Sequence, residues 1–424
     1  MLGGARQRWI RDSCDRDGEP RMTSDPAMPL GGISRRDFLR LLSLGGAAVV
    51  LAGCTRGSQR AGGAVAVVPG DPAAFFKDPA PFIGHPGGVL ESRLELQHGL
   101  ITPNRLFFVR NNSDTATHID ATGWRLRVEG DAVESPMTFS YDDIRALPAR
   151  SLVCYLECAG NHRSMFDLLQ GRQATGTQWG TGAVGNAEWT GAALRDVLVA
   201  AGMAADAVSV LLVGLDSEAP EGGFRRVLPA WKALHPDTLL AYGMNGRELP
   251  RDHGYPLRAV VPGWVGASSI KWLGRIVVSH EQIWTRNNTT SYVLIGGGYP
   301  AEPPAEGQPI TAQVPNSALA LRWPAELPAG LHVMRGYAHS PNGPIAAVQW
   351  SADGGATWRD AALTSSQPQY SWAQFAFDWR AKRGEHTLMT RAIDAAGDTQ
   401  PETVPYNAKG YLFNQPLPHP VRVV

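Results

Sequence analysis

Two thiols and a nearby cationic pair are the first groups in this sequence that could do chemistry. Cys154 and Cys158 lie in the run from Ser151 to Cys158, and His162 and Arg163 follow after a short Ala-Gly-Asn turn. The run is rich in strand-forming residues, and its alternation places both cysteines on one face of a predicted strand. At roughly 3.3 Å per residue, their Cα atoms are about 13 Å apart, whereas a disulfide spans roughly 4.4–6.8 Å. We therefore expect two free thiols.

The two cysteines differ in position. Cys154 lies inside the predicted strand, where it is most simply a small buried apolar residue. Cys158 ends the strand, just before a turn that can present its thiolate, and thiolate is a soft ligand that suits transition metals. One cysteine alone makes neither a zinc site nor an iron–sulfur site. Two interpretations of Cys158 therefore stay open: an inert thiol, or a ligand to a metal that brings its other ligands with it.

Composition limits the classes of protein. The chain of 424 residues is long enough for two cores. Its 39 basic and 39 acidic residues give zero formal net charge, which argues against a surface that binds nucleic acid. No Gly-x-Gly-x-x-Gly run stands between a predicted strand and a helix, and P-loop, Cys-x-x-Cys-His and Gly-x-Ser-x-Gly motifs are missing from the sequence. Dinucleotide, nucleoside triphosphate, covalent haem and serine hydrolase chemistry are therefore not indicated.

The N-terminal residues predict export. Arg35 and Arg36 form a twin-arginine pair before a Gly-interrupted apolar run, which at roughly 13 residues is too short to span a bilayer. We expect an export signal over residues 1–54, with Met28 well placed as a start, and a protein in the periplasm or anchored on the outer side of the cytoplasmic membrane. The segment Leu51–Cys54 resembles a lipobox, so either Cys54 carries a lipid anchor or ordinary cleavage leaves it incidental.

The remaining chain divides into three parts by pattern. Residues 55–99 are predicted to be a linker and N-terminal extension. Residues 100–312 mix strands with short helices, which is typical of an α+β or mixed α/β domain. Residues 313–424 change to short alternating strands with an Asp353-Gly354 hairpin turn, which predicts an immunoglobulin-like β-sandwich. In the middle part, the predicted strands and the predicted helix are Leu106–Arg110, Trp124–Val128, Val208–Val213, Arg258–Val261 and Gly191–Gly202.

Several long motifs, in the same order, resemble those of the sulfite oxidase family of molybdenum enzymes. The resemblance implies a molybdopterin-binding domain followed by the dimerisation domain of that family, and hence a homodimer formed through the sandwich. The matching segments are Phe107–Asn111, Glu157–Arg163, Gln178–Trp179, Trp189–Leu198, Leu240–Gly246, Leu249–Arg258 and Val261–Leu273.

The resemblance also implies roles for individual residues. In this family molybdenum is held by the two dithiolene sulfurs of molybdopterin, by oxo or hydroxo groups, and by one cysteine thiolate, which Cys158 matches. Arg110 and Arg163 match substrate-pocket arginines, whose planar guanidinium groups suit an oxyanion. Trp179 resembles a pocket tryptophan, with core packing as the alternative, and Tyr292 follows the Lys-Trp-Leu motif as the active-site tyrosine does. The residues in motifs that resemble cofactor-binding stretches are His253, Arg258, Ser269 and Lys271.

Two positions depart from the family pattern. Asn112 stands where the family often has a histidine that contacts the cofactor. Lys409, in Tyr406–Gly410, replaces a substrate arginine, and lysine keeps the charge but loses the bidentate fork. We therefore expect the anion site to bind its substrate more weakly, or to have a different shape.

The resemblance implies oxidation of sulfite, or of a related sulfur oxyanion, to sulfate by oxo transfer. Because the chain has no haem motif of its own, the electrons would pass to an external c-type cytochrome. Two alternatives remain. A sulfane dehydrogenase-type subunit would act on protein-bound sulfur, and nothing in the sequence separates it cleanly. A cofactor-free exported binding protein is disfavoured by Cys158 and the basic motifs.

Overall fold

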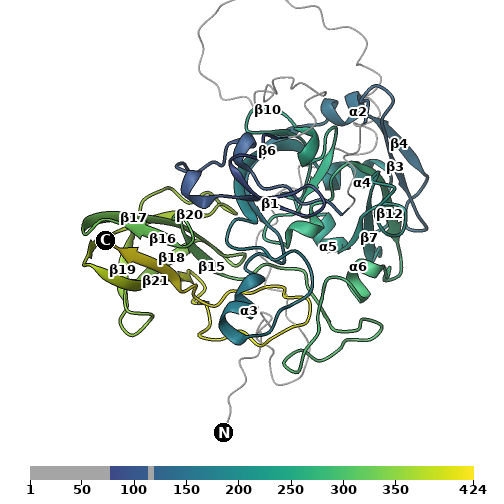
Figure 1. Ribbon diagram of the computed structural model, residues 1–424. Coiled ribbons are helices and arrows are strands. Elements are labelled where there is room, and N and C mark those ends of the chain that lie inside the picture. Colours follow the sequence, from purple (N-terminus) through teal and green to yellow (C-terminus); the bar gives the residue numbers. More distant parts are fainter. Residues whose placement is uncertain (1–76, 113–118) are drawn as a thin grey trace, which may run out of the picture.

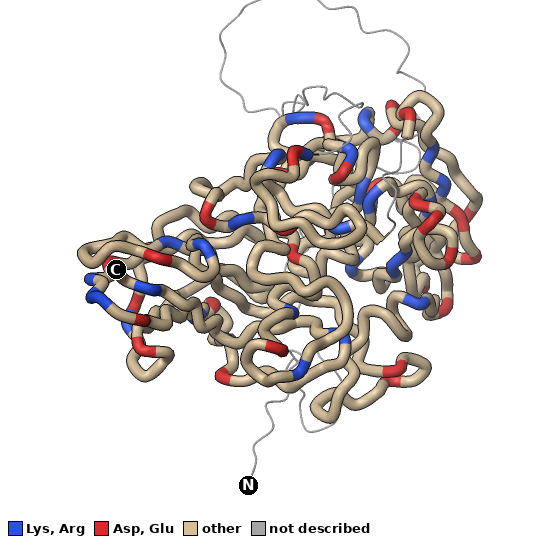
Figure 2. Tube along the Cα trace, viewed as in Figure 1, with Lys and Arg blue, Asp and Glu red and all other residues tan. Residues whose placement is uncertain are grey.

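The computed structural model describes residues 77–112 and 119–424. The predicted export signal, Cys54 and most of the predicted linker lie outside the described residues. Figure 1 shows a larger part with strands and short helices and a smaller part made of strands, to which the C-terminal residues belong. Lys and Arg alternate with Asp and Glu along both parts (Figure 2). Within the described ranges, no helix is both long enough and apolar enough to cross a membrane.

One sheet of the larger part leads to the site. Its strand order is β10-β9-β6-β5, and β11 also pairs with β9. The β5–β6 ladder is antiparallel and runs without interruption from the Ala149–Ala192 pair to the Glu157–Val184 pair, so β5 delivers its last residue to one edge of the sheet. The strands are β5 (Ala149–Glu157), β6 (Val184–Ala193), β9 (Leu239–Met244), β10 (Arg247–Glu248) and β11 (Arg258–Val260).

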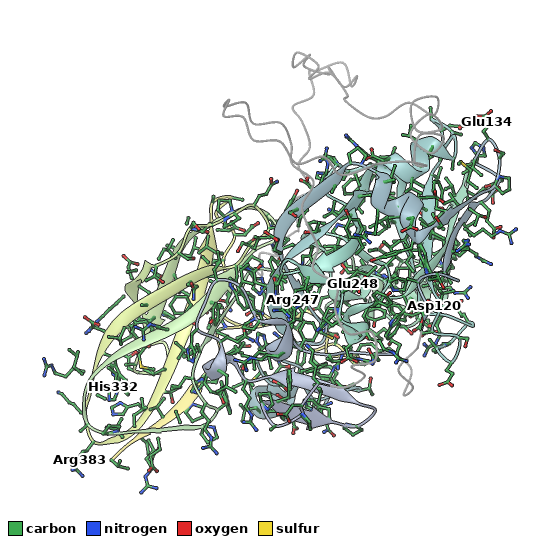
Figure 3. The ribbon with its side chains drawn as sticks, turned by 90° about the horizontal axis from the view of Figure 1, so that it is seen from above. Asp120, Glu134, Arg247, Glu248, His332 and Arg383 are labelled. Atoms are coloured by element: carbon green, nitrogen blue, oxygen red, sulfur yellow. The ribbon has the colours of Figure 1, made fainter. Side chains whose placement is uncertain are left out.

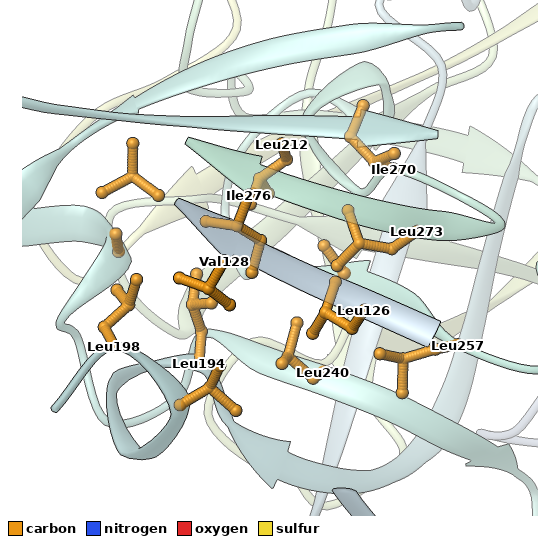
Figure 4. Close-up of a cluster of buried hydrophobic side chains, with 14 of the residues drawn as sticks. Leu126, Val128, Leu194, Leu198, Leu212, Leu240, Leu257, Ile270, Leu273 and Ile276 are labelled. Carbon is orange, nitrogen blue, oxygen red and sulfur yellow. The ribbon is translucent and has the colours of Figure 1, made fainter. Parts of the chain in front are cut away.

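A second sheet packs against the first through the main core. Its order is β4-β3-β12-β7-β8, with β3 and β12 parallel. Leu126 of β3, Ile276 of β12 and Leu240 of β9 are fully buried in one cluster that joins both sheets (Figure 4). Truncating one such leucine to alanine typically costs about 2–5 kcal/mol. The strands are β3 (Arg125–Glu129), β4 (Met137–Ser140), β7 (Ser209–Gly214), β8 (Arg225–Pro229) and β12 (Leu273–Ser279).

The helices are short, and local sequence features explain why two of them, α4 and α2, form where they do. In α4 (Leu194–Ala200), Leu194, Val197 and Leu198 fall on one helical face and are fully buried in the main core, whereas Val199 points outward. In α2 (Tyr141–Ala146), Ser140 and Asp143 form a capping box that satisfies the first backbone donors. The other helices are α3 (Ser164–Gln170), α5 (Ala230–Ala233) and α6 (Arg286–Thr289), with 3-10 turns η1 (Leu94–Leu96), η2 (Asn104–Leu106), η3 (Arg251–His253) and η4 (Gly266–Ser268).

The smaller part is an eight-stranded β domain that curls over one core. Its order is β15-β17-β20-β19-β18-β21-β22-β16. Ser317 of β15 lies 2.9 Å (Oγ to Oγ1) from Thr390 of β21, although several strands separate them in this order. The sheet therefore closes on itself around Trp350, Phe377 and their neighbours. The strands are β15 (Asn316–Leu319), β16 (Ala325–Leu327), β17 (Gly330–His339), β18 (Ile345–Ser351), β19 (Arg359–Leu363), β20 (Ala373–Ala381), β21 (Gly384–Asp394) and β22 (His419–Val423).

The two parts extend in different directions. Seen from above in Figure 3, His332 and Arg383 lie at the far end of the β domain, while Arg247 and Glu248 lie over the α+β part. Between the two parts, the Tyr337 side chain in β17 donates a hydrogen bond to the Gln97 carbonyl, 2.5 Å away. The minor pairs β1 (Phe82–His85) with β2 (Val89–Ser92), and β13 (Val293–Leu294) with β14 (Gln308–Pro309), complete the strands.

An α+β domain followed by a β domain is confirmed, and so is the hairpin of β18 and β19, which are antiparallel. Gly354 adopts φ +68° in the turn between them, a conformation that glycine accepts readily. The predicted strand Leu106–Arg110 is wrong: its start belongs to η2, and beyond that Val109 forms only an isolated bridge to Leu90. The predicted helix Gly191–Gly202 begins three residues later, because Gly191–Ala193 complete β6.

Candidate active site

A pocket opens where β5 ends. It encloses about 740 Å³ of space, part of it open to solvent, and loops from both sheets form its walls. Seven of the ten predicted site residues line it, although they come from distant segments of the chain. These seven are Arg110, Cys158, His253, Arg258, Ser269, Lys271 and Tyr292.

Cys158 is presented to the pocket by a braced turn. Its backbone N–H donates to the Ala183 carbonyl (2.9 Å), and its own carbonyl accepts from the Asn161 N–H (2.9 Å). The Asn161 side chain donates to Glu157 (2.8 Å) and accepts from the Ala183 N–H (3.0 Å). Cys158 is free and half-buried, whereas Cys154 is free and fully buried, and burial raises the pKa of the Cys154 thiol to about 12. The geometry therefore makes Cys158 the thiol that is available to a ligand.

Basic groups also gather at the pocket. Arg258 is buried and donates to the carbonyls of His253 and Ser269, each at 2.9 Å. Both acceptors are neutral, so neither contact balances the positive charge of the guanidinium group. The Lys271 ammonium donates to the Asn111 side chain and to the Asp252 carbonyl (2.8 Å). These contacts place a guanidinium and an ammonium group side by side at one wall.

Lys77 adds a third cation. Its ammonium donates to the Phe107 carbonyl (2.6 Å) and to Nε2 of His253 (2.6 Å). Burial lowers the pKa of Lys77 and of Lys271 to about 7, and Asp252 opposes this for both. Burial also lowers the pKa of Arg258 to about 9 and that of His253 well below its usual value. Burial thus disfavours the protonated, positively charged forms of these four side chains. An anion such as a phosphate would pair with the protonated forms and stabilise them, so the cluster is suited to binding one.

Acidic groups at the pocket are fewer. Asp216 and Asp252 line it, and burial raises the pKa of both carboxyl groups. Ser269 accepts a hydrogen bond from the Val261 N–H (3.0 Å), which fixes its hydroxyl oxygen and leaves its proton able to donate. These residues fit a phosphorylated pterin: cations for the phosphate, a hydroxyl donor, and Cys158 for a metal. Within residues 77–112 and 119–424, no group of three His, Cys, Asp or Glu side chains could hold a metal.

Three predicted site residues do not line the pocket. Trp179 is fully buried and packs against Phe108 and His85, with ring centroids 6.2 and 5.1 Å away. Arg163 lies behind the wall and donates to the Lys409 carbonyl at 2.8 Å. The structure thus brings Arg163 and Lys409 together across most of the chain, and it places Trp179 in the core behind Phe108.

The sequence interpretation missed three groups. Lys77 was assigned to a linker, and Asp252 stands beside His253 within a matched motif, but its type alone gave no signal. Tyr411 follows Lys409 by two residues, and its ring stacks on that of Tyr292, with centroids 5.3 Å apart and planes at 11°. Its proximity to the site depends on the tertiary fold, so no local pattern could reveal it.

Two known domain families match the chain. Residues 112–286 match the oxidoreductase molybdopterin binding domain, and residues 315–421 match the Mo-co oxidoreductase dimerisation domain. Mitochondrial sulfite oxidase of Mus musculus is 33% identical over 363 residues, which cover 81% of this chain and 64% of that protein. Sulfite oxidase of Gallus gallus is 33% identical over 365 residues, covering 81% and 77%.

A solved structure is also similar. The sulfane dehydrogenase SoxCD from Paracoccus pantotrophus matches with a TM-score of 0.70 and 26% identity, over 81% of this chain and 88% of that one. The chain therefore belongs to the sulfite oxidase family of molybdopterin-dependent oxidoreductases, whose cofactor is a molybdenum pterin. It spans 64% of the length of the mouse relative.

Proposed function

We propose that the chain oxidises sulfite, or a related sulfur oxyanion, to sulfate. The observation that carries this proposal is the convergence of Cys158 with a cluster of cations in one pocket. When bound, the molybdenum cofactor would supply a two-electron redox centre and a transferable oxygen. Cys158 would hold the metal, and Arg258, Lys271 and His253 would hold the pterin and its phosphate.

The substrate side of the pocket would be formed by Arg110 and Tyr292. Both line the pocket with Cys158, and the charge of Arg110 lowers the pKa of Tyr292 against the stronger effect of burial, which raises it. The Tyr292 hydroxyl therefore stays protonated at neutral pH and can donate to an oxyanion. The planar guanidinium group of Arg110 can bind such an anion through two parallel hydrogen bonds. This side of the pocket therefore favours small, negatively charged substrates.

Lys409→Arg is expected to lower the KM for sulfite about 3- to 10-fold, with little change in kcat. The Lys409 side chain does not line the pocket, so this prediction rests on the family resemblance and on the contact of the Lys409 carbonyl with Arg163. An arginine at this position would restore bidentate recognition, and hydrogen bonds to charged groups contribute roughly 1.5–3 kcal/mol, of which only part is gained here. Steady-state kinetics on the molybdenum-loaded protein measure the change, with Lys382→Arg, a β-domain variant that lies neither in the pocket nor in a motif matched to the family, as the control. A KM that rises instead would show that Lys409 serves a substrate of another shape.

The second candidate is a sulfane dehydrogenase-type subunit that acts on protein-bound sulfur. The similarity to SoxCD along most of both chains favours it. In either case we propose that an external c-type cytochrome takes the electrons. Turnover of free sulfite against turnover of a persulfide on a carrier protein separates the two. A cofactor-free binding protein is disfavoured, because it would have no use for the buried cations.

We also propose a homodimer through residues 315–421, the stretch that matches the dimerisation domain, folded as an immunoglobulin-like sandwich. The boundaries 100–312 and 313–424 serve as the proposed division into catalytic and dimerisation domains. Light scattering on the purified protein tests the dimer, because a dimer has twice the mass that denaturing mass spectrometry gives for the same chain.

Export through the twin-arginine route remains a proposal, carried by the sequence alone. Changing Arg35 and Arg36 together to lysine is expected to keep most of the protein in the cytoplasm, because the pair is the recognised feature of the signal. Fractionation with an immunoblot measures this, and an exported double variant would contradict it. Cys54→Ser shows whether a lipid anchor exists: the variant would leave the membrane fraction for the soluble periplasm if Cys54 is lipidated.

A further inference from the structure

Tyr411 stands in the middle of a stack of four side chains at the substrate side of the site. The Arg163 guanidinium lies over the Tyr411 ring, 5.1 Å from its centroid. Tyr411 stacks on Tyr292, with centroids 5.3 Å apart and planes nearly parallel at 11°. The Arg226 guanidinium lies 5.2 Å from the centroid of the Tyr292 ring. Two tyrosine rings are thus held between two cations.

Both outer members of the stack are fixed by backbone carbonyls. Arg163 donates to the Lys409 carbonyl (2.8 Å) and to the Thr177 carbonyl (2.6 Å). Arg226 is buried and donates to the carbonyls of Asn287 and Ile310, the latter at 2.8 Å. Because these donors are bound edge-on, the faces of the two guanidinium groups remain available to the rings.

Tyr411 is held from its own segment as well. Its N–H donates to the Asn407 side chain and its carbonyl accepts from that side chain, each at 2.9 Å. Gly410, with φ +62°, lies so close to Arg163 that a Cβ there would stand 2.6 Å from the Cγ of that arginine. The segment from Asn407 to Tyr411 therefore packs closely against Arg163, which restricts its movement.

Of the four members, only Tyr292 lines the pocket. Burial raises the pKa of the Tyr411 hydroxyl, and the neighbouring charges of Arg163 and Arg110 oppose this, so Tyr411 is close to the cations of the substrate side while standing behind Tyr292. A ring in this position can act on a bound anion through Tyr292, by fixing where that side chain lies. Cation–π and offset-stacked contacts are the forces available to it.

We propose that Tyr411 is a positioning residue for anion binding: its aromatic ring, which Arg163 contacts on one face, holds Tyr292 in the arrangement that binds a sulfur oxyanion. The inference rests on the proposed function for its substrate class. The ring carries the effect and the hydroxyl does not, because the contacts on both sides are made to the faces of the ring.

The test uses two kinds of variant on the molybdenum-loaded full chain. Tyr411→Leu and Tyr411→Met remove the ring, and Tyr411→Phe keeps it. Sulfate, which does not react, is the probe for binding by calorimetry, and sulfite is the substrate for kinetics. Tyr406→Leu is the matched control, because Tyr406 directly precedes this segment and carries the same kind of contact, with Arg172 3.7 Å from its ring centroid.

We expect the leucine and methionine variants to bind sulfate about tenfold more weakly and to raise the KM for sulfite on the same scale, which is about 1.4 kcal/mol. Their kcat should change less than about threefold, and molybdenum content should stay the same. Tyr411→Phe should recover sulfate binding to within about twofold of the wild type, as should the Tyr406→Leu control.

Unchanged sulfate binding in Tyr411→Leu and Tyr411→Met would overturn the proposal, and so would a loss in Tyr411→Phe as large as theirs. Weakening of the same size in the Tyr406→Leu control would also overturn it, since the effect would then be a general one of the segment. The sulfate series is independent of turnover. If the wild type bound sulfate in the expected pattern but did not oxidise sulfite, the proposed function would fail and the positioning role of Tyr411 would stand.

Discussion

Replacing Cys158 with serine is expected to lower kcat for sulfite by on the order of 100-fold or more. Changes in the outer shell of a metal site already cost about 10- to 100-fold, and here the ligand itself would be lost. A serine hydroxyl stays protonated where a cysteine becomes a soft thiolate, so it is a poor match for a transition metal. The variant should fold normally, because Cys158 is half-buried and the turn around it is held by backbone and Asn161 contacts.

Cys154→Ala is the matched control for this prediction. Cys154 is a free, fully buried thiol on the same strand, so its truncation should cost stability and leave kcat unchanged. Kinetics, molybdenum content and thermal unfolding are measured on all three proteins. A Cys158→Ser variant with wild-type turnover would remove this residue from the metal site.

Lys271→Met is expected to weaken retention of the pterin cofactor by about 10- to 100-fold. A charge-assisted hydrogen bond is worth roughly 1.5–3 kcal/mol, and each 1.4 kcal/mol is about a factor of ten in affinity. At neutral pH the cofactor-free variant should be at least as stable as the cofactor-free wild type, because methionine fills similar space and carries no charge into the pocket. Molybdenum and pterin content after dialysis measure retention, and urea unfolding measures stability.

The pH dependence of stability has a definite sign. Burial lowers the pKa of Lys271 from 10.5 to about 7 in the folded protein. Between those values the unfolded chain binds more protons, so the free energy of unfolding of the cofactor-free wild type rises with pH. Burial lowers the pKa of Lys77 to the same value, so Lys77 also contributes to the rise of the unfolding free energy with pH. Lys271→Met should therefore make this rise less steep without abolishing it.

Lys232→Met is the control for the cofactor effect. Lys232 is another buried lysine that donates to a carbonyl, that of Pro262 at 3.0 Å, and it does not line the pocket. It should alter stability and leave cofactor content unchanged. Equal loss of cofactor in both variants would mean that a buried lysine acts on the fold in general, and an unchanged content in Lys271→Met would remove Lys271 from the cofactor site.

Local patterns predicted those parts of the structure that local forces determine. The strand that carries Cys154 followed from alternation and strand propensity, although it ends at Glu157 and Cys158 is the first residue after it. The β18–β19 hairpin followed from its turn residues. The segment Leu106–Arg110 misled the interpretation, because its apolar side chains fill the core beside the pocket without a strand partner along their length. Burial alone is not enough to make a strand.

The site was predictable only where its residues stand in matched motifs. Cys158, Arg258 and Lys271 were predicted in this way, and the fold brings them to one pocket. Lys77 and Tyr411 were missed, since each reaches the site from a segment far away in sequence, and their neighbours in the chain give no sign of it. Contacts between segments that are far apart in the sequence can be identified only from the tertiary structure.

The most direct test of the central claim is sulfite-dependent reduction of cytochrome c by the molybdenum-loaded, purified protein. The account predicts turnover that saturates with sulfite and falls by on the order of 100-fold or more in Cys158→Ser. A protein that carries a full molybdenum load and a folded pocket, yet reduces no cytochrome c with sulfite, would contradict sulfite as the substrate.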